Sequence, residues 1–97
     1  FFGAADAIEH IVVKDFTKCL VIRMRSVPAL DTTAMNALKN LAKVCQAKGI
    51  AMVFSHVNEQ PMHVMEKAGF VEIIGEENFR PNISAALERA EEIITVS

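Results

Sequence analysis

The sequence predicts a single α/β domain with a small, mostly parallel sheet and helices packed against it. Two nearly continuous apolar runs, residues 19–24 and 50–54, have the composition of strands that are covered on both faces. Between them, residues 33–48 carry apolar side chains at helical spacing. Strands that alternate with helices favour parallel pairing, and this alternation predicts the fold class.

Length and composition agree with one folded domain. The chain has 97 residues, of which 52% are hydrophobic, so it can form a buried core. A net charge of −2 argues against nucleic-acid binding, which usually leaves a basic footprint. No apolar run approaches the roughly 18 residues that a membrane helix needs. We interpret Cys19 and Cys45 as small buried hydrophobes, consistent with a reducing cytosol.

The elements on either side of this central part are predicted from their apolar spacing. Residues 1–3 are interpreted as the end of a strand whose beginning is missing, and residues 4–13 as a helix. Residues 71–74 are predicted to be a short strand, followed by a loop at 76–81. The last helix is expected to bury Ile83, Ala86, Leu87, Ala90, Ile93 and Ile94.

Capping residues set the predicted helix boundaries. Gly49 follows the helix at 33–48 and fits a C-terminal glycine cap. Asn58 is expected to cap the next helix, which carries Pro61 in its first turn and stops at Gly69. Asn82 is expected to cap the last helix.

The turn at residues 27–34, Val-Pro-Ala-Leu-Asp-Thr-Thr-Ala, joins the first buried strand to the longest helix. Pro28 lacks an amide hydrogen and interrupts a sheet ladder, while Asp31 and Thr32 are good N-cap residues. Such a turn exposes backbone amides and the positive end of the helix dipole. It can hold a phosphate or present a hydroxyl for phosphorylation, although capping alone also explains these residue types.

The sequence shows no convergent set of catalytic or metal-binding residues. His10, His56 and His63 lie far apart and lack metal-ligand spacing, and Cys45 has no nearby base. A glycine-rich phosphate loop is also missing, so a nucleotide is a possible partner that no motif supports. We therefore expect no enzymatic activity, no metal and no cofactor. A small α/β enzyme is disfavoured because acid, base and nucleophile do not converge.

Four segments, in order along the chain, resemble the STAS domain that sulfate transporters share with anti-sigma factor antagonists. Residues 1–6 look like the segment that ends the second strand in transporter STAS domains, and residues 27–34 resemble the central turn. Residues 66–70 match the usual end of the third helix. Glu-Asn-Phe-Arg-Pro, followed by Ala-Ala-Leu, resembles the entry to the last helix. Together the segments cover essentially the whole chain.

The similarity is closest to the C-terminal cytoplasmic STAS domain of bacterial SulP-family anion transporters. It implies a STAS-type fold over residues 1–97, in a fragment that lacks the first strand and most of the second. It also implies a regulatory domain of a sulfate or anion permease at the inner membrane, which modulates transport or trafficking through protein contacts. The implied partners are the transmembrane domain of the same transporter, a second copy in a homodimer, or a cytosolic regulatory protein.

The resemblance also places the functional surface. In anti-sigma factor antagonists the phosphorylated serine occupies the position of Thr33, although this chain has threonine there and Ala34 where the family has glycine. The predicted anion or partner surface consists of Asp31, Thr32, Thr33, Asn36, His56 and Asn58. The alternative function is a stand-alone anti-sigma factor antagonist switched by phosphorylation of Thr33. The transporter-like first residues and the Thr-Ala pair count against that alternative.

Overall fold

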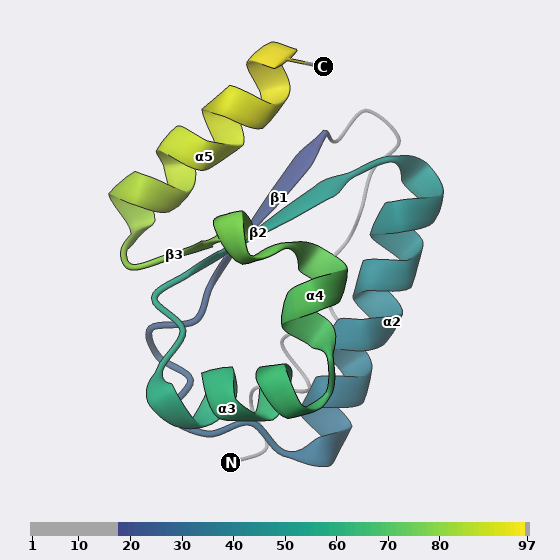
Figure 1. Cartoon of the computed structure of the whole chain (residues 1–97), viewed down its shortest axis with the longest axis vertical. Coiled ribbons are helices and arrows are strands. Elements are labelled where there is room, and N and C mark those ends of the chain that lie inside the picture. The colour runs from purple at the N-terminus through teal and green to yellow at the C-terminus, as the bar shows by residue number, and fades with distance from the viewer. Residues whose placement is uncertain (1–17, 97) are drawn as a thin grey trace.

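A computed structural model describes residues 18–96 of the chain (Figure 1). The expected strand end at residues 1–3 and the expected helix at 4–13 lie outside the described residues. The elements in chain order are β1 (Cys19–Arg23), α2 (Thr32–Lys48), β2 (Ala51–Ser55), α3 (Glu59–Lys67), α4 (Phe70–Ile74), the short 3-10 helix η1 (Glu76–Asn78), β3 (Phe79–Arg80) and α5 (Ile83–Val96).

The described strands form a parallel sheet in the order β1-β2-β3, which confirms the predicted fold class. In the register of the first pair, Leu20 lies opposite Met52 and Ile22 lies opposite Phe54. Phe54 in turn lies opposite Phe79 of β3. Because side chains alternate along a strand, Leu20, Ile22, Met52 and Phe54 point to the same face of the sheet.

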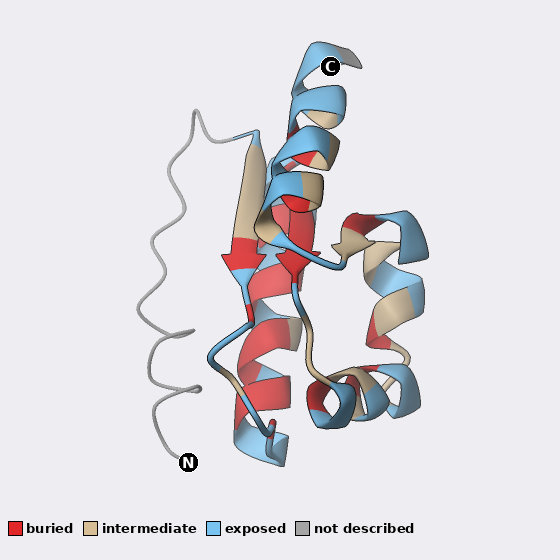
Figure 2. Ribbon diagram, turned by 90° about the vertical axis from the view of Figure 1, so that its left-hand side faces the viewer, coloured by how far each residue is buried: buried red, intermediate tan, exposed pale blue. Residues whose placement is uncertain are grey.

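Helices cover both faces of this sheet, and Figure 1 shows it between α2 and α5. The main core joins β1 and β2 to the buried side of α2, with Met65 of α3 and Phe70 of α4 completing it. On the other face, Val53 of β2 is fully buried, as is Ala86 of α5. Figure 2 shows the buried residues concentrated along the strands and the inner side of α2. Two covered faces explain why both long strands are almost continuously apolar.

Both predicted ends of α2 are confirmed. The Asp31 side chain caps the N-terminus by accepting from the Ala34 amide at 2.8 Å. At the other end, Gly49 has φ +70° and its amide donates to carbonyl oxygens of the last turn. A left-handed conformation at this position favours glycine, so the sequence pattern identified a real stereochemical requirement.

The predicted strand at residues 71–74 is wrong, because this segment is the short helix α4. The third strand instead lies at Phe79–Arg80, inside the segment predicted to be a loop. Phe79 stacks on Phe54 with ring centroids 5.1 Å apart, so packing against β2 selects the strand position. Gly75, expected to end a strand, follows the last residue of α4. Burial of Phe70 in the core holds α4 against the sheet despite its β-branched sequence.

The inner face of α5 is narrower than predicted. Ala86 and Ala90 are buried, whereas Leu87 and Ile94 are 54% and 49% exposed. The predicted cap is confirmed, since Asn82 Oδ1 accepts from the Ala85 amide at 2.8 Å. Two alanines on the buried side let the helix lie close to the sheet, and the larger apolar residues are displaced to its flanks.

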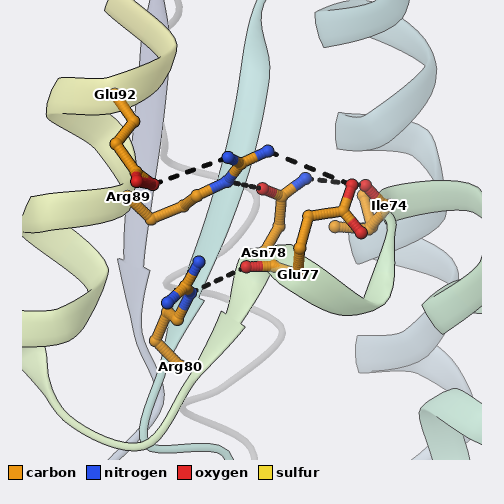
Figure 3. A network of polar contacts seen from close by, with 6 residues as sticks. All are labelled: Ile74, Glu77, Asn78, Arg80, Arg89 and Glu92. Carbon is orange, nitrogen blue, oxygen red and sulfur yellow. Dashed lines mark hydrogen bonds and ion pairs between the residues drawn. The ribbon is translucent and has the colours of Figure 1, made fainter.

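A polar network ties α5 to the segment before β3 (Figure 3). Asn78, which is only 8% exposed, donates from Nδ2 to the Ile74 carbonyl at 2.8 Å and accepts from Arg89 Nε at 2.8 Å. The Arg89 guanidinium also lies 3.6 Å from Glu92 and 4.0 Å from Glu77. The network therefore satisfies a buried amide and fixes α5 relative to α4 and η1.

The two cysteines lie in different parts of the fold. Cys45 on α2 is buried in the core, as predicted. Cys19 on β1 is only partly buried, which corrects the prediction that both cysteines are buried. Cys19 alternates with the core-facing Leu20, so it belongs to the α5 face of the sheet. Burial raises the pKa of both thiols, and nearby Arg89 partly offsets this rise in the pKa of Cys19. Both are therefore protonated thiols at neutral pH.

Candidate functional site

The N-terminus of α2 is exposed, as the sequence predicted. Thr32 and Thr33 form its first turn and both are exposed. Asp31 satisfies the next two amides, because its side chain accepts from Ala34 and its carbonyl accepts from Met35 at 2.9 Å. Helix geometry leaves the amides of Thr32 and Thr33 without an acceptor inside the helix. This end of α2 can therefore receive hydrogen-bond acceptors of a partner.

Asn58 does not cap α3, which corrects the prediction. It occupies the N-cap position but makes no side-chain capping bond. Its Nδ2 instead donates to the carbonyl oxygens of Arg25 at 3.1 Å and Val27 at 2.9 Å. Asn58 thus links the loop after β2 to the loop after β1, which leads to the N-terminus of α2.

Gln60 makes a second link, which sequence reasoning missed. Its Oε1 accepts from the Leu30 amide at 2.7 Å, and its Nε2 donates to the Leu30 carbonyl at 3.4 Å. Leu30 immediately precedes the N-cap of α2 and is buried at 2% exposure. Together Asn58 and Gln60 form a clamp that fixes the chain leading into α2. We call these two residues the α3 clamp.

His56 lies apart from the α2 terminus. It is exposed and has φ +52°, the one positive φ of a non-glycine residue in the part of the chain that the structure describes. Its amide donates to the Arg80 carbonyl at 2.9 Å, which fixes the exit of β2 beside β3. His56 and Arg80 line a cavity of about 430 Å³ that shares no lining residue with the α2 terminus. The predicted surface therefore divides into two places.

A separate groove of about 340 Å³ runs between α2 and α3. Thr32, Asn36 and Lys39 line it from α2, and Val64 and Lys67 line it from α3. The structure thus brings two predicted residues, Thr32 and Asn36, together with two lysines that sequence reasoning had not assigned to a site. The helical spacing of residues 32, 36 and 39 could have suggested one common face, but not the partner helix.

Replacement of Gln60 is expected to loosen the entry to α2. Gln60→Leu removes both links to Leu30 and leaves the Leu30 amide unpaired. It should therefore lower the free energy of unfolding by about 1 kcal/mol. Gln60→Glu keeps the acceptor for the Leu30 amide and should retain part of this stability. Urea unfolding measures the loss, and hydrogen exchange of the Leu30 amide locates it.

The matched control is Gln46→Leu, on the exposed side of α2 near its far end. It should leave the exchange rate of the Leu30 amide unchanged. Equal exchange rates in wild type and Gln60→Leu would show that the clamp does not hold this loop.

The fold and the site define a class of domain, and comparison with known proteins identifies it. The STAS domain family model matches residues 1–86, so the chain belongs to the STAS domain family. The fold also matches the crystal structure of a sulfate transporter family protein from Wolinella succinogenes with a TM-score of 0.87 and 32% identity. That match covers 98% of this chain and 80% of the other.

Further relatives are also sulfate transporters or their domains. The SulP transporter STAS domain from Vibrio cholerae matches with a TM-score of 0.81 and 28% identity, over 99% of this chain and 77% of that chain. Probable sulfate transporter 4.2 of Arabidopsis thaliana is 30% identical over 69 residues. The match covers 71% of this chain and 10% of the plant protein, so the chain spans about a tenth of that relative's length. Within residues 18–96 no helix is long and apolar enough to cross a membrane.

Proposed function

We propose that this STAS domain is a non-catalytic regulatory module of a SulP-type sulfate or anion transporter, held at the cytoplasmic face of the inner membrane. It modulates transport by binding the transmembrane domain of the same transporter. The observation that carries the proposal is the exposed, clamped N-terminus of α2 in a domain whose relatives are sulfate transporters and their STAS domains.

The binding surface of this proposal consists of Asp31, Thr32, Thr33 and Asn36, and we call it the α2 surface. Hydroxyl and amide groups on its first two turns are exposed, and the helix dipole adds a positive field. The α3 clamp holds the preceding loop, so the surface is organised before a partner arrives. A prearranged surface loses less conformational entropy on binding, which favours a recognition role.

No catalytic step is part of this proposal. The raised pKa of Cys19 and Cys45 keeps both thiols protonated at neutral pH, which makes them poor nucleophiles. Two polar side chains at the α2 terminus already have structural roles, because Asp31 caps the helix and Asn58 holds the neighbouring loop.

A bulky cation on the α2 surface is expected to alter transport. Thr33→Arg should weaken docking of the domain about tenfold, which corresponds to about 1.4 kcal/mol. Because docking modulates transport in this proposal, sulfate uptake by the full-length transporter should change by a similar factor. The amount of protein in the membrane should stay constant. Uptake of labelled sulfate into cells, normalised to membrane protein, makes this measurement.

Gln46→Arg is the matched control, because it adds the same charge at an exposed position near the other end of the same helix. It should leave uptake unchanged. Equal uptake by wild type, Thr33→Arg and Gln46→Arg would contradict the proposed role of the α2 surface.

Exposure of Thr33 favours a second candidate, a stand-alone anti-sigma factor antagonist switched by phosphorylation. A phosphate on this residue adds about −1.5 to −2 charges at the positive end of α2, close to the Asp31 carboxylate. The modification would therefore change partner affinity more than it changes the fold. Mass analysis of the protein from its own cells tests this candidate, and an unmodified Thr33 under all growth conditions would refute it.

A further inference from the structure

The proposed function assigns no role to Ser55, a buried polar residue in the central strand. Ser55 ends β2 and is only 2% exposed. Its hydroxyl forms no hydrogen bond with another residue of the part 18–96. In the same part of the chain, every side-chain nitrogen or oxygen that is fully shielded from solvent has a partner. The Ser55 hydroxyl therefore keeps a contact with solvent at the edge of the sheet, where it can donate to a small ligand.

Two arginines flank Ser55 in the register of the sheet. Arg23 of β1 is its partner on one side, and Arg80 of β3 is its partner on the other. The residue before each of these three packs with the main core on the α2 face, so alternation directs all three side chains to the α5 face. Neighbouring strands are about 4.8 Å apart, which places the two arginine Cα atoms about 10 Å apart with the hydroxyl between them. Guanidinium groups from both sides can therefore reach one ion above Ser55.

Both arginines keep their positive charge available to a ligand. Neither of them forms an ion pair within residues 18–96. Arg80 Nε donates to the Glu77 carbonyl at 2.7 Å, which positions the guanidinium and leaves its two terminal nitrogens for other acceptors (Figure 3). The Glu77 carboxylate lies 4.0 Å from Arg89 instead. The charge of Arg80 is therefore not neutralised by the acidic residue that it contacts.

The N-terminus of α5 adds further donors at the same edge of the sheet. α5 begins directly after the turn that follows β3, so its first residues lie beside the carboxyl ends of the strands (Figure 1). Asn82 accepts from the Ala85 amide with its side chain and from the Ala86 amide with its carbonyl. Helix geometry leaves the amides of Ile83 and Ser84 without an acceptor inside the helix. They carry the positive end of the helix dipole.

We propose that Arg23, Ser55, Arg80 and the first two amides of α5 bind one tetrahedral dianion, inorganic sulfate or phosphate. We call these groups the strand-end site. The hydroxyl, the guanidinium groups and the amides all donate hydrogen bonds, and the arginines and the helix terminus are positive, so the site selects an anion. The donors come from the sheet below and from the helix beside it, which suits an ion with oxygens in several directions. The narrow access to Ser55 favours a free ion.

The strand-end site goes beyond the proposed function. It shares no residue with the α2 surface, and it lies on the α5 face of the sheet, whereas α2 packs on the other face. A bound ion would join the ends of all three described strands to the start of α5. The concentration of the ion would therefore determine how firmly α5 is held to the sheet.

Titration of the 97-residue chain with sodium sulfate tests the site directly. Sodium chloride keeps the ionic strength constant, and NMR follows the backbone amides. The shifts should saturate with a dissociation constant of about 1 mM or below, and they should be largest at Ser55, Ile83 and Ser84. Sodium phosphate should give the same pattern. Sodium nitrate, a planar ion with one charge, should bind at least about tenfold more weakly.

Two substitutions separate the hydroxyl from the charge. Ser55→Ala removes one oxygen atom at constant charge, and Arg23→Gln removes one guanidinium group. Each should weaken sulfate binding at least about tenfold, because each removes a hydrogen bond to a charged ligand. Arg25→Gln is the matched control, since it removes the same charge at an exposed position beyond the end of β1 and should bind sulfate like the wild type. Thermal unfolding without sulfate confirms that each variant folds.

Three outcomes would overturn the proposal. Shifts that do not saturate, or an equal loss in Arg25→Gln and Arg23→Gln, would show general charge attraction. Shifts at Thr32 and Thr33 in place of Ser55 would assign the anion to the N-terminus of α2. Binding to phosphatidylcholine vesicles that contain phosphatidic acid, without any response to the free ions, would assign the phosphate to a lipid headgroup. The Thr33→Arg uptake experiment tests the proposed function separately from all three.

Discussion

Phe54→Ala is expected to lower the free energy of unfolding by about 4 kcal/mol, the largest effect of any single substitution proposed for this domain. Phe54 lies in the central strand and is fully buried. Its ring stacks on Phe79 at 5.1 Å and meets Phe70 edge to face at 5.6 Å. Truncation removes both ring contacts and leaves a cavity between β2, β3 and α4, which the surrounding helices cannot fill without moving.

Urea unfolding followed by circular dichroism measures this loss. Val44→Ala, at an apolar position that is 44% exposed, is the control and should change stability by less than about 0.5 kcal/mol. Phe54→Leu retains part of the volume and should give an intermediate loss if the alanine variant does not fold. A loss below about 1 kcal/mol for Phe54→Ala would contradict the central position of this ring.

Asn78→Ala is expected to cost about 2–3 kcal/mol, because it breaks two hydrogen bonds of a buried side chain. The Ile74 carbonyl loses its donor, and Arg89 Nε loses its acceptor (Figure 3). Arg89 is held at two other points by Glu77 and Glu92, but these longer contacts are partly exposed and contribute little. The substitution should therefore release α5 from the segment that precedes β3.

Asn40→Ala is the control, at an exposed position on α2. Asn78→Asp separates the two bonds, since it keeps an acceptor for Arg89 but loses the donor to Ile74. Its stability should fall between those of the wild type and Asn78→Ala. Equal stability of Asn78→Ala and Asn40→Ala in thermal unfolding would show that the network does not stabilise the fold.

The strands and helices with long, regular patterns could be predicted from the sequence. The apolar runs of β1 and β2 reflect a sheet with helices on both faces, and α2 carries both of its expected caps. Local pattern and tertiary environment agree in these elements, which is why a one-dimensional interpretation was sufficient.

The segment after Gly69 could not be predicted, because its local preference conflicts with its tertiary contacts. Val71, Ile73 and Ile74 favour a strand by composition, yet they form α4. Two residues, Phe79 and Arg80, provide the strand instead, and a strand of this length leaves almost no periodicity in the sequence. The stacking of Phe79 on Phe54 decides the outcome and is a contact across 25 positions of the chain.

The candidate site also combines features that could be predicted from the sequence with features that could not. The cap formed by Asp31 depends on residues three positions apart, and its residue type and position predict it. Gln60 and Asn58 form hydrogen bonds with backbone atoms about 30 positions away. Every residue has a backbone amide or carbonyl, so the sequence does not indicate which one is the partner. The roles of Thr32, Thr33, Asn36 and His56 in binding stay predictions, and the uptake experiment tests that of Thr33.

The parallel pairing of the described strands also determines when the domain can acquire its structure during synthesis. β2 cannot pair with β1 until the ribosome has made the whole of α2, because Cys19 lies opposite Ala51. Pairing strands this far apart in the sequence loses loop-closure entropy before the contacts between the strands form. Folding of this topology is therefore slow relative to helix formation. Within residues 18–96, α5 covers the second face of the sheet and is made last. Val53 is therefore exposed on the nascent chain until the final helix emerges, a period in which chaperones can protect it.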